Sequence, residues 1–551
     1  MPNLRFMVHH LQHISDLIDL CRQCGIRNVV ISPGSRNAPL IQGFTALDEM
    51  TCHSIPDERV AGYFAMGIAL ETGTPVVVLC TSGTATLNLA PAVAEAFYQH
   101  VPLVVITADR PVELVDNQQN QTIPQQEIYS GFIKQSLNLS SSNIDEVSRV
   151  LSLSTEPHPG PVHINVPVRE PLYEVLPPSS AGKATFRKEI KSDSKLPAEI
   201  TDAVRSASKI LILCGQQRPD EALSATLKKI LQEKNAVVVA EAISNIDLPE
   251  VIANTEPVIA SIKENERKEF LPDLLISTGG HVVSKRWMLW MQKHPELNHW
   301  RVSEAPDQVD TYGNLKGIIS GTPASVIEQL MSHFDNSDQT YFNLWQRKNN
   351  QLQRNKTEYL EQAPFCELKV FELLLKNLPE DCNLHLGNGS VVRYAQMFDF
   401  KKSVRVYGNR GVSGIDGSFS TATGVSAANP EKMNILIIGD MSFIYDSNAM
   451  WNRNLPENII IFVINNSGGG IFRLIDGPSQ HEWFEPFQVA QHPVSIRNLS
   501  LAFGLEYYRR ESEEEIRDEM PIMLKKGKPV VVEIVTPADI NEKVFKQFYK
   551  I

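Results

Sequence analysis

Short runs of apolar residues alternate with longer segments of helical periodicity along most of the chain of 551 residues. Runs of this length, bounded by turn residues, are typical of buried strands, and the helical segments between them supply crossover connections. The alternation predicts an α/β fold with mainly parallel sheets flanked by helices. The runs fall into three groups: residues 28–32, 75–80, 102–107 and 161–167; residues 209–215, 236–242, 273–280 and 299–305; and residues 382–387, 403–408, 434–440, 459–465 and 529–536.

Two polar segments separate these groups. Residues 176–197 are rich in Pro, Ser and Lys, a composition typical of a linker, and residues 335–359 are polar and charged. The sequence therefore predicts three α/β domains of similar size, over residues 1–180, 197–340 and 358–551.

Composition narrows the class of protein. Apolar residues make up 42% and charged residues 21% of the chain, as in ordinary globular proteins. The formal charge of -12 would repel a phosphate backbone, so nucleic acid is not expected as a partner. We also expect a cytoplasmic location without a membrane span, because no apolar run is long enough and the first residues lack a signal-peptide layout. Of the seven cysteines, two form a CxxC pair, Cys21 and Cys24. We expect these two thiols to pack a helix rather than bind metal.

Polar residues follow two strands of the third group. Asp440 comes directly after residues 434–439, and an Asn-Asn-Ser-Gly-Gly-Gly segment starts at the end of the next strand. Side chains at the carboxyl ends of parallel strands can bind a ligand together, and carboxylate and amide oxygens suit Mg²⁺. This spacing resembles the diphosphate-binding motif of thiamin-diphosphate enzymes. The resemblance implies Mg²⁺ ligands at Asp440, Asn466 and Gly468, with Mn²⁺ as a possible substitute, although Met441 replaces the glycine that commonly follows the Asp.

Glu58 is the candidate catalytic acid. It starts a predicted amphipathic helix that is poor in other acids, a position where an acid by itself often only stabilises the helix dipole. Enzymes that use thiamin diphosphate need a glutamate hydrogen-bonded to the aminopyrimidine ring, so that the ring can take the proton from the thiazolium. The resemblance assigns that role, and a cofactor contact, to Glu58.

Basic residues also gather near predicted strand ends, in a chain that is acidic overall. They are Arg36, Arg110, Lys285, Arg286, Arg393 and Arg410. A single such residue is usually a solvated cation, but six at ligand-binding edges indicate anionic substrates with more than one carboxylate.

Stretches across all three predicted domains resemble one family. They are SPGSR, DER, TSGTA, TADRP, NQT, SKR, NRGxSGIDG, GD and NNxGGxIF, between residues 32 and 472. They are similar to the 2-succinyl-5-enolpyruvyl-6-hydroxy-3-cyclohexene-1-carboxylate synthases of menaquinone biosynthesis. The resemblance implies decarboxylation of 2-oxoglutarate and addition of the succinyl semialdehyde carbanion to isochorismate. It also implies pyrimidine-binding, central and diphosphate-binding domains, in that order, in a homodimer or homotetramer whose active sites lie at subunit interfaces.

The resemblance carries roles to individual positions. Isochorismate would be bound by Ser35, Arg36, Arg110, Gln121, Lys285 and Arg286, and the distal carboxylate of 2-oxoglutarate by Arg393 and Arg410. The cofactor would contact Ile415, Ser442, Asn466, Ile471 and Phe472, with Ile415 holding it in a bent conformation. Family members commonly read GNS where this chain reads Gly-Asn-Gly-Ser, so Ser390 is a substrate-binding candidate displaced by one position.

Two alternatives remain at this stage. The chain could be a related thiamin-diphosphate enzyme, such as an acetohydroxyacid synthase or a simple 2-oxo acid decarboxylase, which would need fewer cations around its substrate. It could also be a catalytically silent regulator that binds a small anion, although intact Glu58, Asp440 and Asn466 argue against that.

Overall fold

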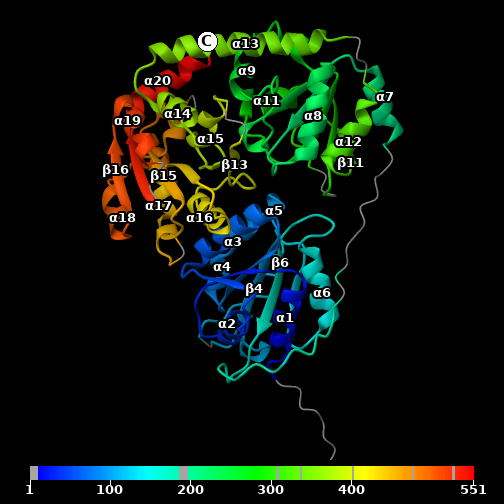
Figure 1. The fold of residues 1–551 in the computed structure, drawn as a ribbon, viewed down its shortest axis with the longest axis vertical. Helices are drawn as coiled ribbons and strands as arrows, with labels where there is room; N and C mark the ends of the chain where they lie inside the picture. The colour runs from blue at the N-terminus through cyan, green and yellow to red at the C-terminus, as the bar shows by residue number, and fades with distance from the viewer. Residues whose placement is uncertain are drawn as a thin grey trace, which may run out of the picture. The chain divides into compact units, whose positions relative to one another are not determined.

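The computed structural model describes residues 10–118, 120–184, 186, 196–305, 309–334, 338–399, 403–453, 455–474, 477–523 and 528–551 (Figure 1). Within these residues the strands form three parallel sheets, each accompanied by helices that follow its strands in the chain. The predicted α/β class is therefore confirmed. None of the helices among these residues is both long and apolar enough to cross a bilayer.

The first sheet has the strand order β2-β1-β3-β4-β6-β5. Every residue of β3 and β4 is buried, which explains why these strands are continuous apolar runs in the sequence. The strands are β1 (Asn28–Ile31), β2 (Thr51–Ser54), β3 (Val76–Cys80), β4 (Leu103–Asp109), β5 (Ser136–Asn138) and β6 (Val162–Pro167). The helices are α1 (Gln12–Gln23), α2 (Ala38–Thr45), α3 (Glu58–Thr72), α4 (Thr84–Asn88), α5 (Ala90–Tyr98) and α6 (Ile144–Leu153).

The second sheet has the order β11-β10-β9-β7-β8. Its strands are β7 (Ile210–Cys214), β8 (Val237–Ala240), β9 (Leu274–Thr278), β10 (Asn298–Ser303) and β11 (Leu315–Ser320). The helices of this part of the chain are α7 (Ala198–Ser206), α8 (Glu221–Glu233), α9 (Thr255–Ser261), α10 (Arg267–Phe270), α11 (Lys285–Gln292) and α12 (Pro323–Met331).

The third sheet has the order β13-β12-β14-β15-β17-β16. Its strands are β12 (Asn383–Leu386), β13 (Arg405–Tyr407), β14 (Asn434–Gly439), β15 (Ile459–Asn465), β16 (Glu506–Arg510) and β17 (Val530–Val535). The helices are α13 (Thr340–Gln362), α14 (Glu367–Lys376), α15 (Ser390–Ala395), α16 (Ser418–Ala428), α17 (Asp440–Tyr445), α18 (Ile496–Ala502), α19 (Glu513–Met523) and α20 (Ala538–Phe548).

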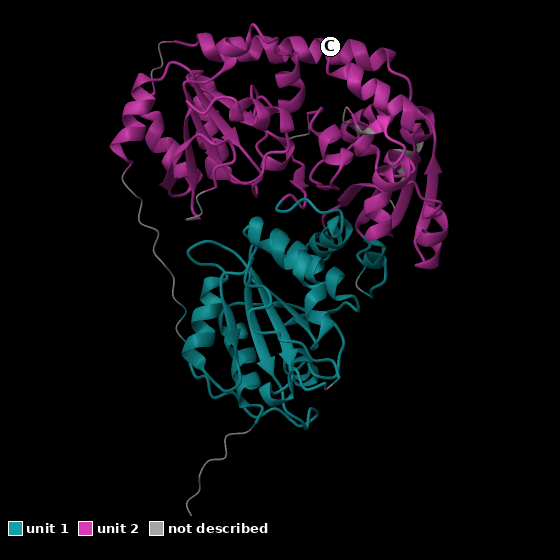
Figure 2. Ribbon diagram, turned by 180° about the vertical axis from the view of Figure 1, so that it is seen from behind, with its two compact units in different colours: residues 1–190, 411–431, 446–457 teal, residues 191–410, 432–445, 458–551 magenta. Residues whose placement is uncertain are grey.

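The chain divides into two compact units, which Figure 2 draws in different colours. The first unit consists of residues 1–190, 411–431 and 446–457, so it combines the first sheet with α16. The second unit consists of residues 191–410, 432–445 and 458–551 and contains the other two sheets.

Helix α3 is buried far more completely than the sequence suggested. We expected an amphipathic helix, but every residue from Val60 to Ala69 is buried, because α3 packs on β3 and α5 and also lies beside α16 (Figure 1). Glycines allow this close approach. A Cβ on Gly67 would lie 2.2 Å from the carbonyl oxygen of Thr421, and one on Gly424 would lie 2.1 Å from that of Phe64.

The two polar segments behave differently. The described part of residues 176–197 contains no helix or strand, as expected for a linker. Residues 335–359, in contrast, do more than separate two sheets, because most of them form α13. Tyr341, Trp345 and Leu352 of this helix are buried in an apolar cluster with residues of the second sheet.

The CxxC cysteines lie where α1 ends. Cys21 is buried in the helix and Cys24 follows it as a half-buried residue. Burial raises the pKa of Cys24 to about 11, and that of Cys21 well above its usual range. Both thiols therefore stay protonated at neutral pH, which suits packing better than metal binding.

Candidate active site

Asp440 and Asn466 lie at the same edge of the third sheet. Strands β14 and β15 pair in parallel up to Gly439 and Ile464, and the two polar residues follow their ends. Asp440 is 1% exposed and Asn466 is 7% exposed. Both side chains therefore lie at one buried edge of the sheet, where their positions after parallel strands led us to expect them.

Backbone N–H groups hold the carboxylate of Asp440. Its Oδ1 accepts a hydrogen bond from the N–H of Met441 (2.7 Å) and its Oδ2 accepts one from the N–H of Gly468 (2.9 Å). The ring of His492 lies 3.4 Å from Oδ2, and its interaction with Asp440 raises the pKa of His492. A carboxylate oxygen has more than one acceptor site, so each still has capacity for a cation.

The amide of Asn466 has one satisfied end and one unsatisfied end. Its Nδ2 donates to Glu367 Oε1 over 2.6 Å, whereas its buried Oδ1 has no hydrogen-bond partner among the described residues. Leaving a buried oxygen unpaired costs about 1–3 kcal/mol, so a ligand that pairs with this oxygen would be stabilising. Together with the Asp440 carboxylate it offers the hard oxygen donors that Mg²⁺ requires.

The glycine segment after Asn466 packs tightly around the amide. Gly468 is buried, with φ +147°, and its carbonyl accepts a hydrogen bond from the N–H of Gly470 (2.9 Å) while keeping a second lone pair. A Cβ on Gly470 would lie 2.3 Å from Asn466 Nδ2. Ile471 and Phe472 follow, both half-buried. The residues present therefore fit a divalent cation, with oxygen ligands from Asp440, Asn466 and Gly468.

Three basic side chains gather elsewhere in the second unit. Arg410 is buried and its Nη1 donates to Asn388 Oδ1 over 2.8 Å, and Arg393 is half-buried near the end of α15. Partial burial, and then the positive charges of Arg410 and Arg393, lower the pKa of His281 to about 4. His281 is therefore uncharged at neutral pH, and the positive charge that favours an anion here comes from Arg393 and Arg410. Ser390 is the half-buried first residue of α15.

Lys285 and Arg286 are the exposed first residues of α11. Arg286 Nε lies 3.3 Å from Glu256 Oε1, and its guanidinium lies 4.8 Å from the centre of the Tyr549 ring. The buried carboxylate of Glu241 accepts hydrogen bonds from the two backbone N–H groups that precede the helix. These two hydrogen bonds fix the backbone just before the helix start that carries Lys285 and Arg286.

The first unit brings together another pair of cations. Arg36 is buried and its Nη1 donates to the carbonyl of Val168 over 2.9 Å. Its Nη2 forms a salt bridge with Glu170 Oε1 over 3.2 Å. Burial, and then the positive charge of Arg110, lower the pKa of Arg36, so the charge of Arg110 acts on it. Arg110 Nε is buried and has no hydrogen-bond partner among the described residues.

Gln121 and Ser35 have exposed side chains in this unit. The backbone carbonyl of Gln121 accepts a hydrogen bond from Ser82 Oγ over 2.9 Å, and its φ is +58°. The neighbouring Gly83 donates its N–H to Gln125 Oε1, and Gln125 Nε2 donates to Asn165 Oδ1. These buried contacts fix the loop that carries Gln121.

Glu58 is the first residue of α3, as predicted, and is half-buried. Asp57 caps the helix by accepting hydrogen bonds from the backbone N–H groups of Arg59 and Val60. Because Asp57 performs the capping, the Glu58 side chain is not needed for it. Glu58 Oε2 instead accepts a hydrogen bond from Asn88 Nδ2 over 3.2 Å.

The predicted site residues are divided between the two units. Ser35, Arg36, Glu58, Arg110, Gln121 and Ile415 belong to the first, whereas Lys285, Arg286, Ser390, Arg393, Arg410, Asp440, Ser442, Asn466, Gly468, Ile471 and Phe472 belong to the second. Ser442 is buried in α17, and Ile415 is exposed.

Sequence reasoning missed three residues, His281, Glu367 and His492. His281 follows β9 within three residues, so the strand-end rule that selected Lys285 could also have selected it. Glu367 starts a helix and His492 lies in a loop, and neither position has a comparable marker.

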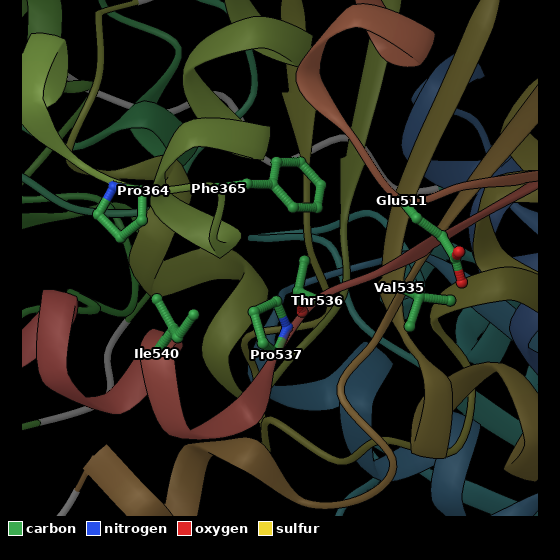
Figure 3. A pocket seen from close by; sticks show the side chains of 7 residues that line it. All are labelled: Pro364, Phe365, Glu511, Val535, Thr536, Pro537 and Ile540. Carbon is green, nitrogen blue, oxygen red and sulfur yellow. The ribbon is translucent and has the colours of Figure 1, made fainter.

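The second unit also contains an apolar pocket of about 390 Å³, shown in Figure 3. It is lined by Pro364, Phe365, Glu511, Val535, Thr536, Pro537 and Ile540. None of these is a predicted site residue, and Glu511 is the one ionisable group among them, so the lining offers little for binding a dicarboxylate.

Comparison with known proteins identifies the family. A family model described as "Thiamine pyrophosphate enzyme, N-terminal TPP binding domain" matches residues 14–129, and one described as "Thiamine pyrophosphate enzyme, C-terminal TPP binding domain" matches residues 387–534. The first contains Glu58 and the second contains Asp440 and Asn466.

Curated relatives match nearly the whole chain. A protein of Flavobacterium psychrophilum is 37% identical over 544 residues, covering 97% of this chain and 98% of its own length. One of Bacteroides thetaiotaomicron is 36% identical over 552 residues, with 98% of each chain covered, and one of Desulfotalea psychrophila is 39% identical over 511 residues, with 90% and 93% covered. All three are named 2-succinyl-5-enolpyruvyl-6-hydroxy-3-cyclohexene-1-carboxylate synthase. The chain therefore belongs to the thiamine pyrophosphate enzymes and, among them, to the 2-succinyl-5-enolpyruvyl-6-hydroxy-3-cyclohexene-1-carboxylate synthase family.

Proposed function

We propose that this protein uses thiamin diphosphate and Mg²⁺ to decarboxylate 2-oxoglutarate and transfer the remaining four-carbon unit to isochorismate. The products would be 2-succinyl-5-enolpyruvyl-6-hydroxy-3-cyclohexene-1-carboxylate and CO₂. The names of the relatives support this reaction. The observation that carries the proposal is the buried, unpartnered Oδ1 of Asn466 at the sheet edge that also presents Asp440.

Asp440, Asn466 and the carbonyl of Gly468 would hold the cation, with Mn²⁺ able to replace Mg²⁺. Ser442, Ile471, Phe472 and Ile415 would contact the cofactor. When bound, thiamin diphosphate supplies a thiazolium that can accept the electron pair left by decarboxylation. The protein would bind, orient and neutralise the groups around it.

Glu58 would hold a proton at its carboxyl group and hydrogen-bond the aminopyrimidine ring. Two observations support this role over a purely structural one. Asp57 already caps α3, and the Glu58 carboxyl is half-buried and contacted by an amide rather than by a cation. A carboxyl placed in this way can exchange a proton with a bound ring.

Different basic residues would bind each of the two substrates. Arg393 and Arg410 would bind the distal carboxylate of 2-oxoglutarate, and the neutral ring of His281 and the hydroxyl of Ser390 would donate hydrogen bonds to it. Isochorismate would be bound by Ser35, Arg36, Arg110, Gln121, Lys285 and Arg286. The buried Nε of Arg110, which has no hydrogen-bond partner in the described part of the chain, supports this division, because a carboxylate could accept its N–H.

We further propose that the active protein is a homodimer or homotetramer with its sites at subunit interfaces. This rests on the family resemblance and on the separation of Glu58 and Asp440 into different units. Analytical ultracentrifugation combined with activity measurements tests it. A fully active monomer would exclude the proposed assembly.

An assay with purified protein, thiamin diphosphate and Mg²⁺ tests the reaction. Release of CO₂ from 2-oxoglutarate should depend on isochorismate, and mass spectrometry should detect the joined product. Rapid CO₂ release without an acceptor would instead identify a simple decarboxylase. Absence of release in every combination would identify a binding protein without this activity.

A further inference from the structure

The amide of Asn466 is held by a buried carboxylate outside the proposed metal site. Glu367, the first residue of α14, is 2% exposed. Its Oε1 accepts hydrogen bonds from Asn466 Nδ2 (2.6 Å) and from Asn541 Nδ2 (3.2 Å). The backbone N–H of Glu367 in turn donates to Asn541 Oδ1 over 2.9 Å.

This cluster is tied to the end of β17. Asn541 Nδ2 also donates to Thr536 Oγ1 over 3.0 Å, and Thr536 lines the apolar pocket of Figure 3. Asn541 is buried on α20, so it links Glu367 on α14 to α20 and to the end of β17. Such a carboxylate has little freedom to rotate away from Asn466.

We infer that Glu367 is a positioning residue that fixes the orientation of the Asn466 amide. An amide has a donor end and an acceptor end of nearly equal size, so its neighbours decide which end faces where. Glu367 Oε1 already accepts an N–H group from the amide of Asn541, so it acts as an acceptor and selects Nδ2 of Asn466. The oxygen is then left facing away from Glu367, available to a cation.

The inference rests on the proposed metal site and explains why that site is ready before a cation binds. A reversed amide would place Oδ1 against Glu367 Oε1 and direct N–H groups at the cation. Both contacts would be repulsive. Residues that hydrogen-bond a metal ligand without touching the metal typically contribute about 10-fold to 100-fold to metal affinity.

The first test compares two replacements of Glu367. Glu367→Met keeps the approximate size but removes the acceptor, and we expect it to weaken Mn²⁺ binding about 10-fold to 100-fold. Glu367→Gln can still accept a hydrogen bond from Asn466, so its Mn²⁺ affinity should stay within about threefold of that of the wild type. Binding is measured from the free Mn²⁺ signal by electron paramagnetic resonance, with thiamin diphosphate present, so the result does not depend on turnover.

The chain offers a matched control in Glu241. This carboxylate is also buried in the second unit, but it accepts from the N–H groups of Val283 and Ser284 and contacts none of the proposed metal ligands. Glu241→Met should lower the melting temperature as Glu367→Met does, yet leave Mn²⁺ affinity unchanged. Equal weakening by both variants, or wild-type affinity in Glu367→Met, would overturn the inference.

A second test exchanges donor and acceptor and introduces no apolar side chain. Asn466→Asp should set a second carboxylate against that of Glu367. Adding Glu367→Gln supplies an N–H donor, so the double variant should bind Mn²⁺ at least about tenfold more tightly than the single variant. A double variant that is no better would overturn the inference.

Asp440→Ala separates failure of the inference from failure of the proposed function. If Asp440→Ala loses Mn²⁺ binding but Glu367→Met does not, the metal site stands and the role of Glu367 is wrong. If neither change affects Mn²⁺ binding, the cation site itself is wrong, and the inference fails with it.

Discussion

Replacing Gly67 by alanine tests the close packing of α3 against α16. The added Cβ would lie 2.2 Å from the carbonyl oxygen of Thr421 and 2.9 Å from the backbone nitrogen of Val425. Real Cβ atoms essentially never come within 3.0 Å of another heavy atom, so the helices must separate by at least about 0.8 Å. Because the obstructing atoms belong to backbone, no side-chain rotation can relieve the clash.

Two opposing terms set the size of the effect. Alanine is favoured over glycine inside a helix by about 1 kcal/mol. Overpacking of a buried site costs about 1–3 kcal/mol, and backbone obstruction places this site at the upper end. We therefore expect Gly67→Ala to destabilise the α3–α16 contact by about 1–2 kcal/mol in total.

Hydrogen exchange of individual backbone amides is the appropriate measurement, because a chain of several domains need not unfold in one step. Amides of α3 and α16 should exchange roughly 5 to 30 times faster in Gly67→Ala than in the wild type. Gly43→Ala is the control, since the atoms within 3.0 Å of a Cβ there are terminal methyl groups of Ile18 and Leu176, which can move. Unchanged exchange in Gly67→Ala would refute the reasoning.

Changes at the candidate active site should separate chemistry from binding. Glu58→Gln should abolish exchange of the C2 proton on bound thiamin diphosphate, measured by NMR, with only a small loss of cofactor affinity; a wild-type exchange rate would contradict the role of Glu58. Asp440→Ala should weaken Mg²⁺ and cofactor binding by at least about 100-fold in calorimetric titrations, because it removes a charged ligand. Arg393→Glu should lower kcat/KM for 2-oxoglutarate, and Arg110→Glu that for isochorismate, each about 100-fold or more, because an unpaired desolvated charge costs about 3–5 kcal/mol. Arg149→Glu, at an exposed position on α6, should change neither value, and equal losses for both substrates in both active-site variants would contradict the proposed division.

The central strands could be predicted closely from the sequence, whereas β2, β5, β11 and β16, which lie at sheet edges, could not. The predicted run 434–440 corresponds to β14 (Asn434–Gly439), and 459–465 corresponds to β15 (Ile459–Asn465). These strands are buried on both faces and so are apolar throughout. Edge strands such as β2 (Thr51–Ser54) and β16 (Glu506–Arg510) have half-exposed, polar residues, and no apolar run marks them.

Helix α13 shows why composition alone misjudged residues 335–359. The segment is mostly polar because a long helix with one buried face exposes the rest of its surface. Among its buried residues, Tyr341, Trp345 and Leu352 follow one another at intervals of four and seven positions. That spacing is helical, so periodicity could have distinguished the helix from a plain connection.

Site residues that directly follow a strand could be predicted from the sequence. Residues that only hydrogen-bond another site residue could not. Asp440 and Asn466 follow β14 and β15, so the topology of a parallel sheet brings them to one edge. Glu367 lies 99 positions before Asn466 in the chain and starts a helix, a place where an acid is common for other reasons. Only the folded structure reveals that its carboxylate faces an amide.

Buried carboxylates hold the backbone of two loops next to proposed substrate-binding cations. Glu95 accepts hydrogen bonds from the N–H groups of Gly411 and Val412, next to the predicted substrate residue Arg410. Glu241 does the same for the segment before Lys285, and burial raises the pKa of both carboxyls, that of Glu241 to about 7. Burying an acid is costly unless hydrogen bonds compensate it, so each of these groups is favourable only while its loop keeps the observed conformation. The cost of burial therefore restrains both loops. In this way Glu95 and Glu241 fix the backbone next to Arg410 and Lys285, two of the proposed substrate-binding cations.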